Sequence, residues 1–199
     1  MLGVVLSDNL LLLVVFWELT SLSSFLLIGF WSHRGDARDG ARQALAITGG
    51  GGLAMLGGFV LLGQIAGTHE ISAMAARAAA IQADPRFVPA LLLILLGAFT
   101  KSAQFPFHFW LPDAMAAPTP VSAYLHSATM VKAGVFLLMR LHPVLAGSGL
   151  FEAIVSTVGL VTLVFAAFIA LFKHDLKGLL AYSTVSQLGL IVFLIGLGS

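Results

Sequence analysis

Four ionisable side chains lie well away from the ends of the apolar stretches of this sequence: Glu18, Lys101, His126 and Lys132. A charged group in hydrocarbon is costly, so each must face protein or water, and such groups commonly mark the path of an ion or a substrate. Glu18 lies near the middle of the first apolar stretch and Lys101 near the middle of the third. At a rise of about 1.5 Å per residue, two helices that cross in the same direction bring these residues to similar depth. We therefore predict that Glu18 and Lys101 meet inside the membrane.

The Glu18–Lys101 pair allows two interpretations. Moving an ionised carboxylate or ammonium into a medium of low dielectric constant is costly, and pairing offsets much of that cost, so the two residues could simply pin two helices together. Lys101, His126 and Lys132, however, would share two adjacent stretches with one evident counter-charge. Because a histidine titrates near neutral pH, His126 is suited to passing a proton in either direction. This surplus of titratable groups favours a proton relay over a static clamp.

Pro106 and Pro112 interrupt the third apolar stretch soon after Lys101. A proline inside a helix removes an amide hydrogen bond and clashes with the carbonyl four residues earlier, which for Pro106 is that of Ser102. Interrupted backbone is tolerated at membrane depth only where it faces protein or water. The third stretch is therefore predicted to be a discontinuous helix whose freed carbonyls hold water next to Lys101.

The composition excludes several classes of protein. Hydrophobic residues make up 59% of the 199 residues and charged residues 10%, whereas a soluble domain has about 25% charged residues. The net charge is +1 with no basic run, so no nucleic-acid partner is expected. The absence of cysteine excludes disulfides, thiolate metal sites and iron–sulfur clusters held by this chain. We predict a protein in contact with the lipid bilayer, with no cofactor and no metal site of its own.

Six stretches approach the length of about 20 apolar residues that a membrane-crossing helix needs. Their approximate bounds are 9–30, 42–65, 88–112, 120–141, 151–172 and 178–197. Residues 1–6 are too short to span and are interpreted as the end of a preceding helix, so the start of the sequence is interpreted as truncated. Residues 67–87 are predicted to form a loop with a short surface helix. The predicted fold is an all-α, polytopic membrane helix bundle of about six spans, with one discontinuous helix and an N-terminal helix stub.

Gly49 to Gly52 form a run within the second stretch. A nucleotide-binding glycine loop would need a preceding strand and spaced glycines, whereas this run lies in a continuous apolar stretch. In a membrane bundle, glycines let helix backbones approach closely. The run is therefore predicted to pack against a neighbouring helix.

Lysine and arginine are distributed unevenly between the connections. The first, third and fifth connections contain Arg34, Arg38, Arg42, Lys173 and Lys177, and the opposite side contains Arg77, Arg86 and Arg140. Cytoplasmic loops of membrane proteins carry an excess of basic residues. The first set is therefore predicted to face the cytoplasm.

Several longer motifs occur in order along the chain: KSAQFP at 101–106, WLPDAM at 110–115, PTPVSAYLH at 118–126, SATMVKAG at 127–134 and DLKGLLAYSTVSQ at 175–187. Together they resemble the proton-conducting antiporter module shared by Mrp-type Na+/H+ antiporters and the antiporter-like subunits of respiratory complex I. FWEL at 16–19 and the phenylalanines of FPFHFW are most similar to the large A-type subunit of Mrp antiporters.

The resemblance implies roles for five residues. Glu18 and Lys101 match the family's membrane carboxylate and its broken-helix lysine. His126 and Lys132 match relay positions on the next helix, and Lys177 matches a lysine on the cytoplasmic side of the path. The implied function is proton translocation within a cation/proton antiporter complex, by a transporter subunit rather than an enzyme.

The resemblance also implies a fold, partners and a location. The family fold pairs inverted repeats of five helices, so residues 1–199 are predicted to be a single transmembrane domain, a fragment with most of the first repeat and the first two helices of the second. The implied partners are other membrane subunits of a hetero-oligomeric complex, and the implied ions are H+ and Na+. The implied location is the cell's inner or plasma membrane, as a multi-pass protein.

Three other functions stay open at this point. The same helices could pump protons as a subunit of an NADH–quinone oxidoreductase or a membrane hydrogenase. The truncated ends would also fit an inactive structural remnant. Finally, His108 and His126 could bind a haem, although His108 is predicted to be an interfacial residue at the broken end of its helix.

Overall fold

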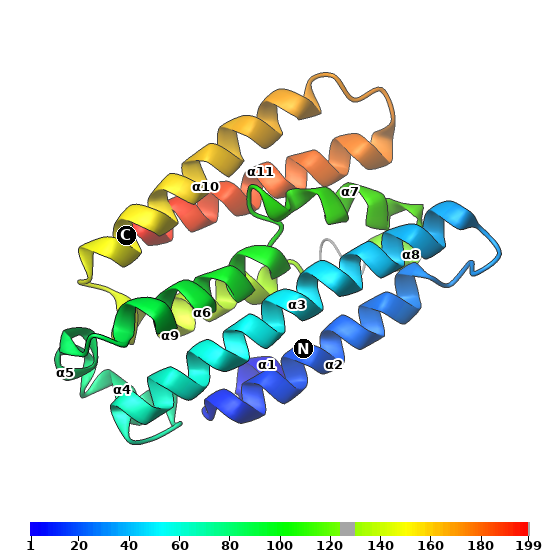
Figure 1. The fold of residues 1–199 in the computed structure, drawn as a ribbon. Helices are drawn as coiled ribbons and strands as arrows, with labels where there is room; N and C mark the ends of the chain where they lie inside the picture. The colour runs from blue at the N-terminus through cyan, green and yellow to red at the C-terminus, as the bar shows by residue number, and fades with distance from the viewer. Residues whose placement is uncertain (124–129, 199) are drawn as a thin grey trace.

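The chain folds into a bundle of long helices in the computed structural model, which describes residues 1–123 and 130–198 (Figure 1). The long helices are α2 (Leu10–Ile28), α3 (Gly35–Ala66), α6 (Phe87–Lys101), α9 (Lys132–Leu145), α10 (Gly149–Ala170) and α11 (Leu176–Gly196). The short helical elements are α1 (Leu2–Leu6), α4 (Ile71–Ala75), α5 (Ala78–Ala83), η1 (Phe107–Phe109), α7 (Trp110–Asp113), η2 (Ala114–Ala116) and α8 (Thr119–Ala123). The prediction of an all-α fold is confirmed for the described residues, in which Asn9 and Glu70 form an isolated β-bridge but no strand.

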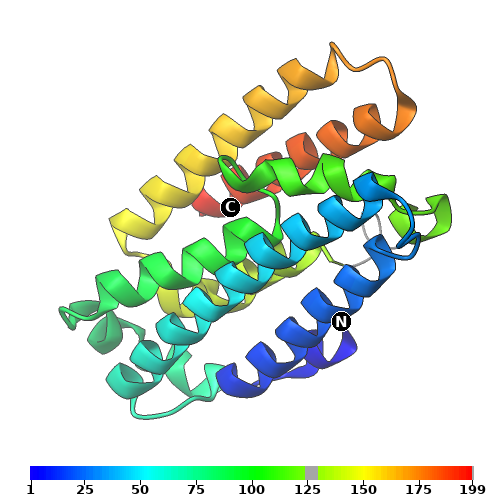
Figure 2. The same ribbon diagram turned by 45° about the vertical axis from the view of Figure 1, so that its right-hand side comes forward.

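Two groups of helices make up the bundle. α2, α3 and α6 lie side by side, and α9 packs against α6 (Figures 1 and 2). α10 and α11 form a hairpin, and α11 contacts the first group through α9 and α7. The irregular segment between α6 and α8 therefore lies between the two groups and reaches both.

Side-chain caps mark the starts of three long helices. The Asn9 side chain accepts hydrogen bonds from the amides of Leu11 and Leu12, at 3.0 and 3.2 Å, at the start of α2. Ser148 and Asp175 accept an amide hydrogen bond in the same way at the starts of α10 and α11. Such caps satisfy amides that have no partner within the helix. Short-range sequence signals therefore set these three helix starts.

Four helices are long and apolar enough to cross a membrane: α2, α3, α10 and α11. They coincide with four of the six predicted stretches. The third stretch is divided, because α6 has 15 residues and ends before the irregular segment. In the fourth stretch, α8 and α9 lie on either side of residues outside the described part of the chain. The all-helical membrane fold is supported, and the count of six spans is not confirmed.

α3 begins earlier than the sequence predicts. The apolar run placed its start near Arg42, whereas the helix begins at Gly35. The additional residues include Asp36 and Arg38, which are polar and exposed. A helix can extend beyond the hydrocarbon into water, so an apolar run gives only the length needed to cross. In the same way, the loop at 67–87 contains two short helices, α4 and α5, where one was predicted.

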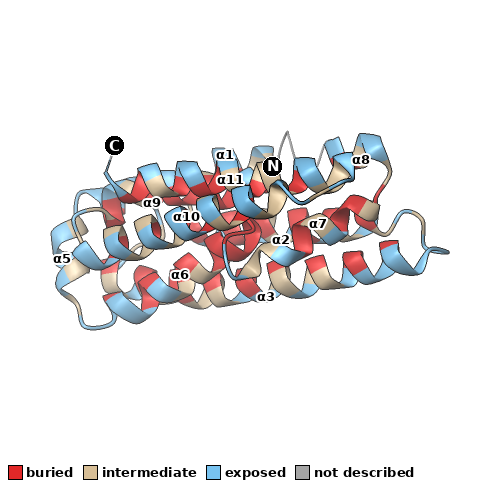
Figure 3. Ribbon diagram, turned by 90° about the horizontal axis from the view of Figure 1, so that it is seen from above, coloured by how far each residue is buried: buried red, intermediate tan, exposed pale blue. Residues whose placement is uncertain are grey.

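The outer faces of the bundle are largely apolar. Figure 3 shows exposed residues along the outward sides of the helices and buried residues between them. Leu26, Val164 and Leu180 have exposed fractions of 69%, 61% and 60%. Large exposed apolar surfaces mark contact with a membrane or a protein partner. This apolar surface is therefore suited to direct contact with the lipid bilayer.

At one end of the bundle, Asp8 joins three segments. Its carboxylate accepts hydrogen bonds from the Ser72 amide at 3.2 Å, the Ser72 hydroxyl at 2.5 Å and the Arg140 guanidinium at 2.9 Å. The hydrogen bond from the Ser72 hydroxyl is the main reason that the pKa of Asp8 lies below its ordinary value. Asp8 thus ties the α1–α2 connection to the loop after α3 and to α9.

We expect the Asp8→Asn substitution to loosen this end locally with little effect on global stability. The side chains of Asp8 and Arg140 are 42% and 41% exposed, and exposed ion pairs contribute at most about 1 kcal/mol. Because the folded-state pKa of Asp8 is lowered, its stabilisation is complete above the ordinary aspartate value of about 4 and is lost as the pH falls further. Hydrogen exchange at the Ser72 amide should become several-fold faster at pH 7, with Asp36→Asn at the opposite end as the control. An unchanged exchange rate would contradict this role of Asp8.

Candidate functional site

Lys101 is the last residue of α6, and its side chain is completely buried. Its Nζ donates to Ser21 Oγ at 2.7 Å and to the backbone oxygen of Trp17 at 3.4 Å, both on α2. Nζ also lies 5.4 Å from the centroid of the Trp17 ring, within the range of a cation–π interaction. Lys101 therefore reaches from α6 to α2, where two oxygens and a ring face take the place of water.

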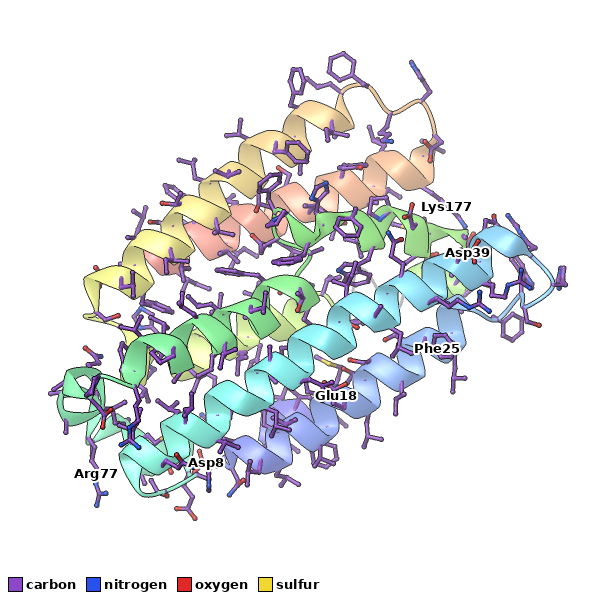
Figure 4. All side chains as sticks on the ribbon, in the orientation of Figure 1. Asp8, Glu18, Phe25, Asp39, Arg77 and Lys177 are labelled. Carbon is purple, nitrogen blue, oxygen red and sulfur yellow. The ribbon has the colours of Figure 1, made fainter. Side chains whose placement is uncertain are left out.

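Glu18 follows Trp17 on α2 and points toward α3 (Figure 4). Its side chain is half-buried, and Oε1 is buried with no hydrogen-bond partner among the described residues. A Cβ atom at Gly49 would lie 3.9 Å from Glu18 Oε2, and one at Gly52 would overlap Glu18 Oε1. The glycine run of α3 therefore leaves room for a carboxylate.

Glu18 and Lys101 attract each other without forming a direct ion pair. The charge of each acts on the other, but no carboxylate oxygen of the described residues lies within 4.0 Å of Lys101 Nζ. The Lys101 ammonium donates a hydrogen bond to Ser21 on α2, and the Glu18 carboxylate lies against the glycines of α3. The structure thus brings Glu18 and Lys101 into one region, where each side chain contacts a different helix.

The backbone that follows Lys101 is held by side chains. Trp110 Nε1 donates to the Thr100 carbonyl at 2.9 Å, one of the last carbonyls of α6, which have no partner within the helix. Ser102 Oγ accepts a hydrogen bond from the Val135 amide at 3.0 Å, which ties the irregular segment to the first turn of α9. Non-helical backbone is therefore surrounded by protein here, as the hydrocarbon region requires.

The two predicted helix-breaking prolines occupy different positions. Pro106 directly precedes η1, whereas Pro112 lies within the short helix α7. α6 already ends at Lys101, and Ala103 has a left-handed φ of 48°. The discontinuity therefore begins directly after Lys101, where the opened backbone was predicted, and the role of the two prolines in it stays a prediction.

Lys177 lies on α11, across the irregular segment from α6. Its Nζ donates to the backbone oxygens of Met115 and Ala117, at 3.2 and 3.0 Å. Together with Ser122 it lines a cavity of about 260 Å³. Figure 4 places Lys177 at the end of the bundle where Asp39 lies. Lys177 therefore connects a cavity near that end with the segment that follows the helix break.

Of the remaining predicted relay residues, Lys132 is exposed and His126 lies outside the described residues. Lys132 is the first residue of α9, and Met130 and Val131 before it form a turn. Its predicted depth assumed one uninterrupted helix from Pro120, which the described residues do not form. The structure therefore does not place Lys132 with the buried pair.

His108 packs in an aromatic cluster with residues of α10 and α11, and the interfacial position predicted for it stays a prediction. Its ring centroid lies 4.8 Å from that of Phe165 on α10 and 6.3 Å from that of Tyr182 on α11. His108 Nδ1 is buried and has no partner among the described residues. Haem binding by His108 and His126 stays untested because His126 is not described. Within the described part of the chain, no three His, Asp or Glu residues are grouped so that they could hold a metal ion.

Ser21 was not among the predicted site residues, although it is the nearest partner of Lys101. Residues three and four apart lie on one face of a helix. Ser21 therefore shares a face of α2 with Trp17 and Glu18, and this spacing could have identified it.

An apolar helix bundle with a buried lysine beside interrupted backbone is typical of polytopic membrane proteins. Residues 7–199 match the family described as "NADH:quinone oxidoreductase/Mrp antiporter, TM". The chain belongs to this family, which confirms the resemblance predicted from its motifs. With its long apolar helices, it is a multi-pass protein of the plasma membrane.

Individual relatives agree with this assignment. The chain is 65% identical, over its whole length, to the A/B subunit of a "Probable K(+)/H(+) antiporter" from Rhizobium meliloti (strain 1021) and covers 20% of that protein. It matches the Mrp complex from Dietzia sp. DQ12-45-1b with a TM-score of 0.92 and 45% identity, over 100% of this chain and 22% of that one. It matches the membrane-bound sulfane sulfur reductase, an archaeal respiratory membrane complex, with a TM-score of 0.88 and 29% identity, over 98% of this chain and 40% of that one. The chain thus spans about a fifth to a quarter of the length of the curated relatives that it matches.

Proposed function

We propose that this chain conducts protons within a monovalent cation/proton antiporter complex. The observation that carries the proposal is the completely buried Lys101, held by Ser21 at a helix break and close to Glu18 without touching it. A structural clamp would place the two charges in contact, because a buried charge is costly unless it is directly paired. A lysine that exchanges a proton instead needs surroundings that accept both its charged and its neutral form.

The supports of Lys101 suit both forms. The ammonium donates to the Ser21 hydroxyl oxygen and the Trp17 carbonyl, whereas a neutral amine can accept a hydrogen bond from the Ser21 hydroxyl. Glu18 Oε1 is buried and without a partner among the described residues, so it is available to accept a proton or a water. We expect protons to pass between Lys101 and Glu18 through intervening water, at a rate that depends on their separation.

Lys177 would extend this path toward the predicted cytoplasmic end. It lines the cavity of about 260 Å³ and holds the segment that follows the break. Lys132 and His126 would complete the relay, on the basis of the resemblance. Other membrane subunits of a hetero-oligomeric complex are the proposed partners.

We further propose that residues 1–199 form one transmembrane domain with six crossings. α6 with the irregular segment would supply the third crossing, and the chain from α8 to α9 the fourth, in addition to the four long helices. This arrangement corresponds to most of one five-helix repeat and the first two helices of an inverted one.

The cation exchanged for H+ is proposed to be Na+. K+ is the alternative, since it stands in the name of the Rhizobium meliloti relative. Antiport in vesicles supplied with each salt in turn distinguishes the two.

Two neighbouring glycines provide a test of this function. A Cβ atom at Gly52 would overlap the Glu18 carboxylate, whereas one at Gly50 would meet nothing within 4 Å. We expect Gly52→Ala to lower ΔpH-dependent antiport about 10-fold in vesicles that contain the whole complex, because a reacting group displaced by about 1 Å can lose up to about 100-fold in rate. Gly50→Ala should transport normally. Equal transport by the two variants, or no antiport by the unmodified complex, would contradict the proposal.

A second candidate function is proton pumping in a respiratory membrane complex. The match to the sulfane sulfur reductase, with a TM-score of 0.88, favours it. In that case redox chemistry elsewhere in the complex would drive the same buried pair. Neighbouring genes for quinone- or flavin-binding subunits would support this candidate, and genes for small antiporter subunits would support cation/proton exchange.

A further inference from the structure

A second cavity lies on the surface where α2 ends and α3 begins. It has a volume of about 330 Å³, and its lining includes Phe25, Leu26, Arg38 and Arg42. Phe25 and Leu26 belong to the last turn of α2, and the two arginines to the first turns of α3. Figure 4 shows Phe25 toward the end of the bundle where Asp39 also lies. The cavity thus combines an apolar wall with a basic rim, at the predicted cytoplasmic end.

The positive charge of this rim is only partly neutralised within the chain. Arg38 and Arg42 share one face of α3, where like charges repel, and cations near the start of a helix oppose its dipole. Asp36 pairs with Arg34, and Asp39 lies 3.7 Å from Arg42 with both side chains mostly exposed. No carboxylate of the described residues lies within 4.0 Å of the Arg38 guanidinium. An anion at this position would offset a repulsion that the chain itself leaves in place.

An apolar stripe continues from the cavity along α2. Val15, Leu19, Leu22 and Leu26 have exposed fractions of 55%, 52%, 51% and 69%. Residues at this spacing lie on one face of a helix. At about 1.5 Å per residue the stripe is roughly 16 Å long, close to half of the hydrocarbon thickness of about 30 Å. It therefore has the length of an acyl chain in one leaflet and begins beside the basic rim.

We propose that this surface binds an anionic phospholipid. Its phosphate would lie at Arg38 and Arg42, and one acyl chain would pass Phe25 and follow the stripe on α2. The planar guanidinium of arginine matches phosphate with two parallel hydrogen bonds. Basic pockets between membrane helices on the cytoplasmic side bind anionic headgroups, and the cytoplasmic leaflet is the anionic one. The general excess of basic residues in cytoplasmic loops would explain the presence of Arg38 and Arg42, but it would not explain why they lie beside an apolar cavity that continues into an apolar stripe. The proposal is independent of the proton path.

The test uses the assembled complex with the full-length subunit, reconstituted in nanodiscs that contain photoactivatable phosphatidylglycerol. We expect the probe to label the segment 25–42. The Arg38→Gln, Arg42→Gln double variant should lose about 30-fold in labelling, and each single variant about 5-fold, because each basic group adds about that factor near an anionic lipid. Arg34→Gln is the matched control, since Arg34 pairs with Asp36 and is not among the residues that line the cavity. Its labelling should equal that of the unmodified complex.

Further arms separate the lipid from other occupants. Leu22→Asn with Leu26→Asn should also weaken labelling, because the acyl chain loses its apolar track. Equal labelling by a phosphatidylcholine probe would overturn the proposal, as would full labelling of the double arginine variant. Competition by soluble glycerol phosphate as strong as that by phosphatidylglycerol would show a phosphate site instead of a lipid site. No labelling of the unmodified complex would show that another subunit or segment covers this surface, and would equally overturn it.

Discussion

Replacement of Lys101 by methionine is expected to reduce proton-coupled antiport by the assembled complex about 1000-fold, close to the background of the vesicles. Methionine resembles lysine in length and is apolar, so the buried site keeps most of its volume while losing the group that carries the proton. Groups that transfer protons contribute roughly 100- to 10,000-fold to the reactions they serve. The measurement is the rate at which an imposed pH difference dissipates after the cation is added.

The Lys101→Arg variant distinguishes a relay from a clamp. Arginine keeps a positive charge and can donate to Ser21, but its guanidinium does not release its proton in proteins. If Lys101 only held two helices together, this variant would preserve transport; we expect a loss close to that of the methionine variant. Lys173→Met is the control, because Lys173 Nζ lies over the Tyr182 ring at 5.0 Å, away from the buried pair. Full transport by Lys101→Arg in a normally assembled complex would exclude the relay.

The long helices could be predicted because each depends on local composition. α2, α10 and α11 begin at side-chain caps and end close to the ends of their apolar stretches. The proximity of Glu18 and Lys101 could also be predicted from helical rise, because both were counted along single stretches of sequence. Features that depend on a single helix, such as its start, its end and the position of a residue along it, could therefore be predicted from the sequence.

The features that depend on other helices could not be predicted. α6 ends at Lys101, where the Thr100 carbonyl accepts a hydrogen bond from Trp110 further along the chain, and this contact between distant segments has no sequence signal. The spacing of Ser21 from Glu18 shows that the two residues share a helix face, but the contact of Ser21 with Lys101 joins two helices and could not be predicted. The depth predicted for Lys132 depended on an assumed helix continuity that the described residues lack.

Replacement of Glu18 by glutamine is expected to lower antiport about 100-fold while leaving the complex assembled. Glutamine keeps the shape of the side chain beside Gly52 and removes the proton acceptor, whose loss falls in the range of proton-transfer groups. The expected loss is smaller than that for Lys101, because Lys101 keeps its hydrogen bonds to Ser21 and Trp17. Glu152→Gln is the control, since Glu152 Oε1 accepts a hydrogen bond from the Gly147 amide at the start of α10.

Thermal stability of the Glu18→Gln complex decides between the two interpretations of the pair. Breaking a buried ion pair by removing one partner costs about 3–5 kcal/mol. Glu18 is only half-buried, and its carboxylate makes no direct ion pair with Lys101, so the loss of stability should stay well below that range. A clamp predicts the reverse: a large fall in stability, with normal transport by the complexes that still assemble. The relay therefore requires the loss to appear in the transport rate per assembled complex, and a Glu18→Gln complex that transports normally but melts early would show that the pair is structural.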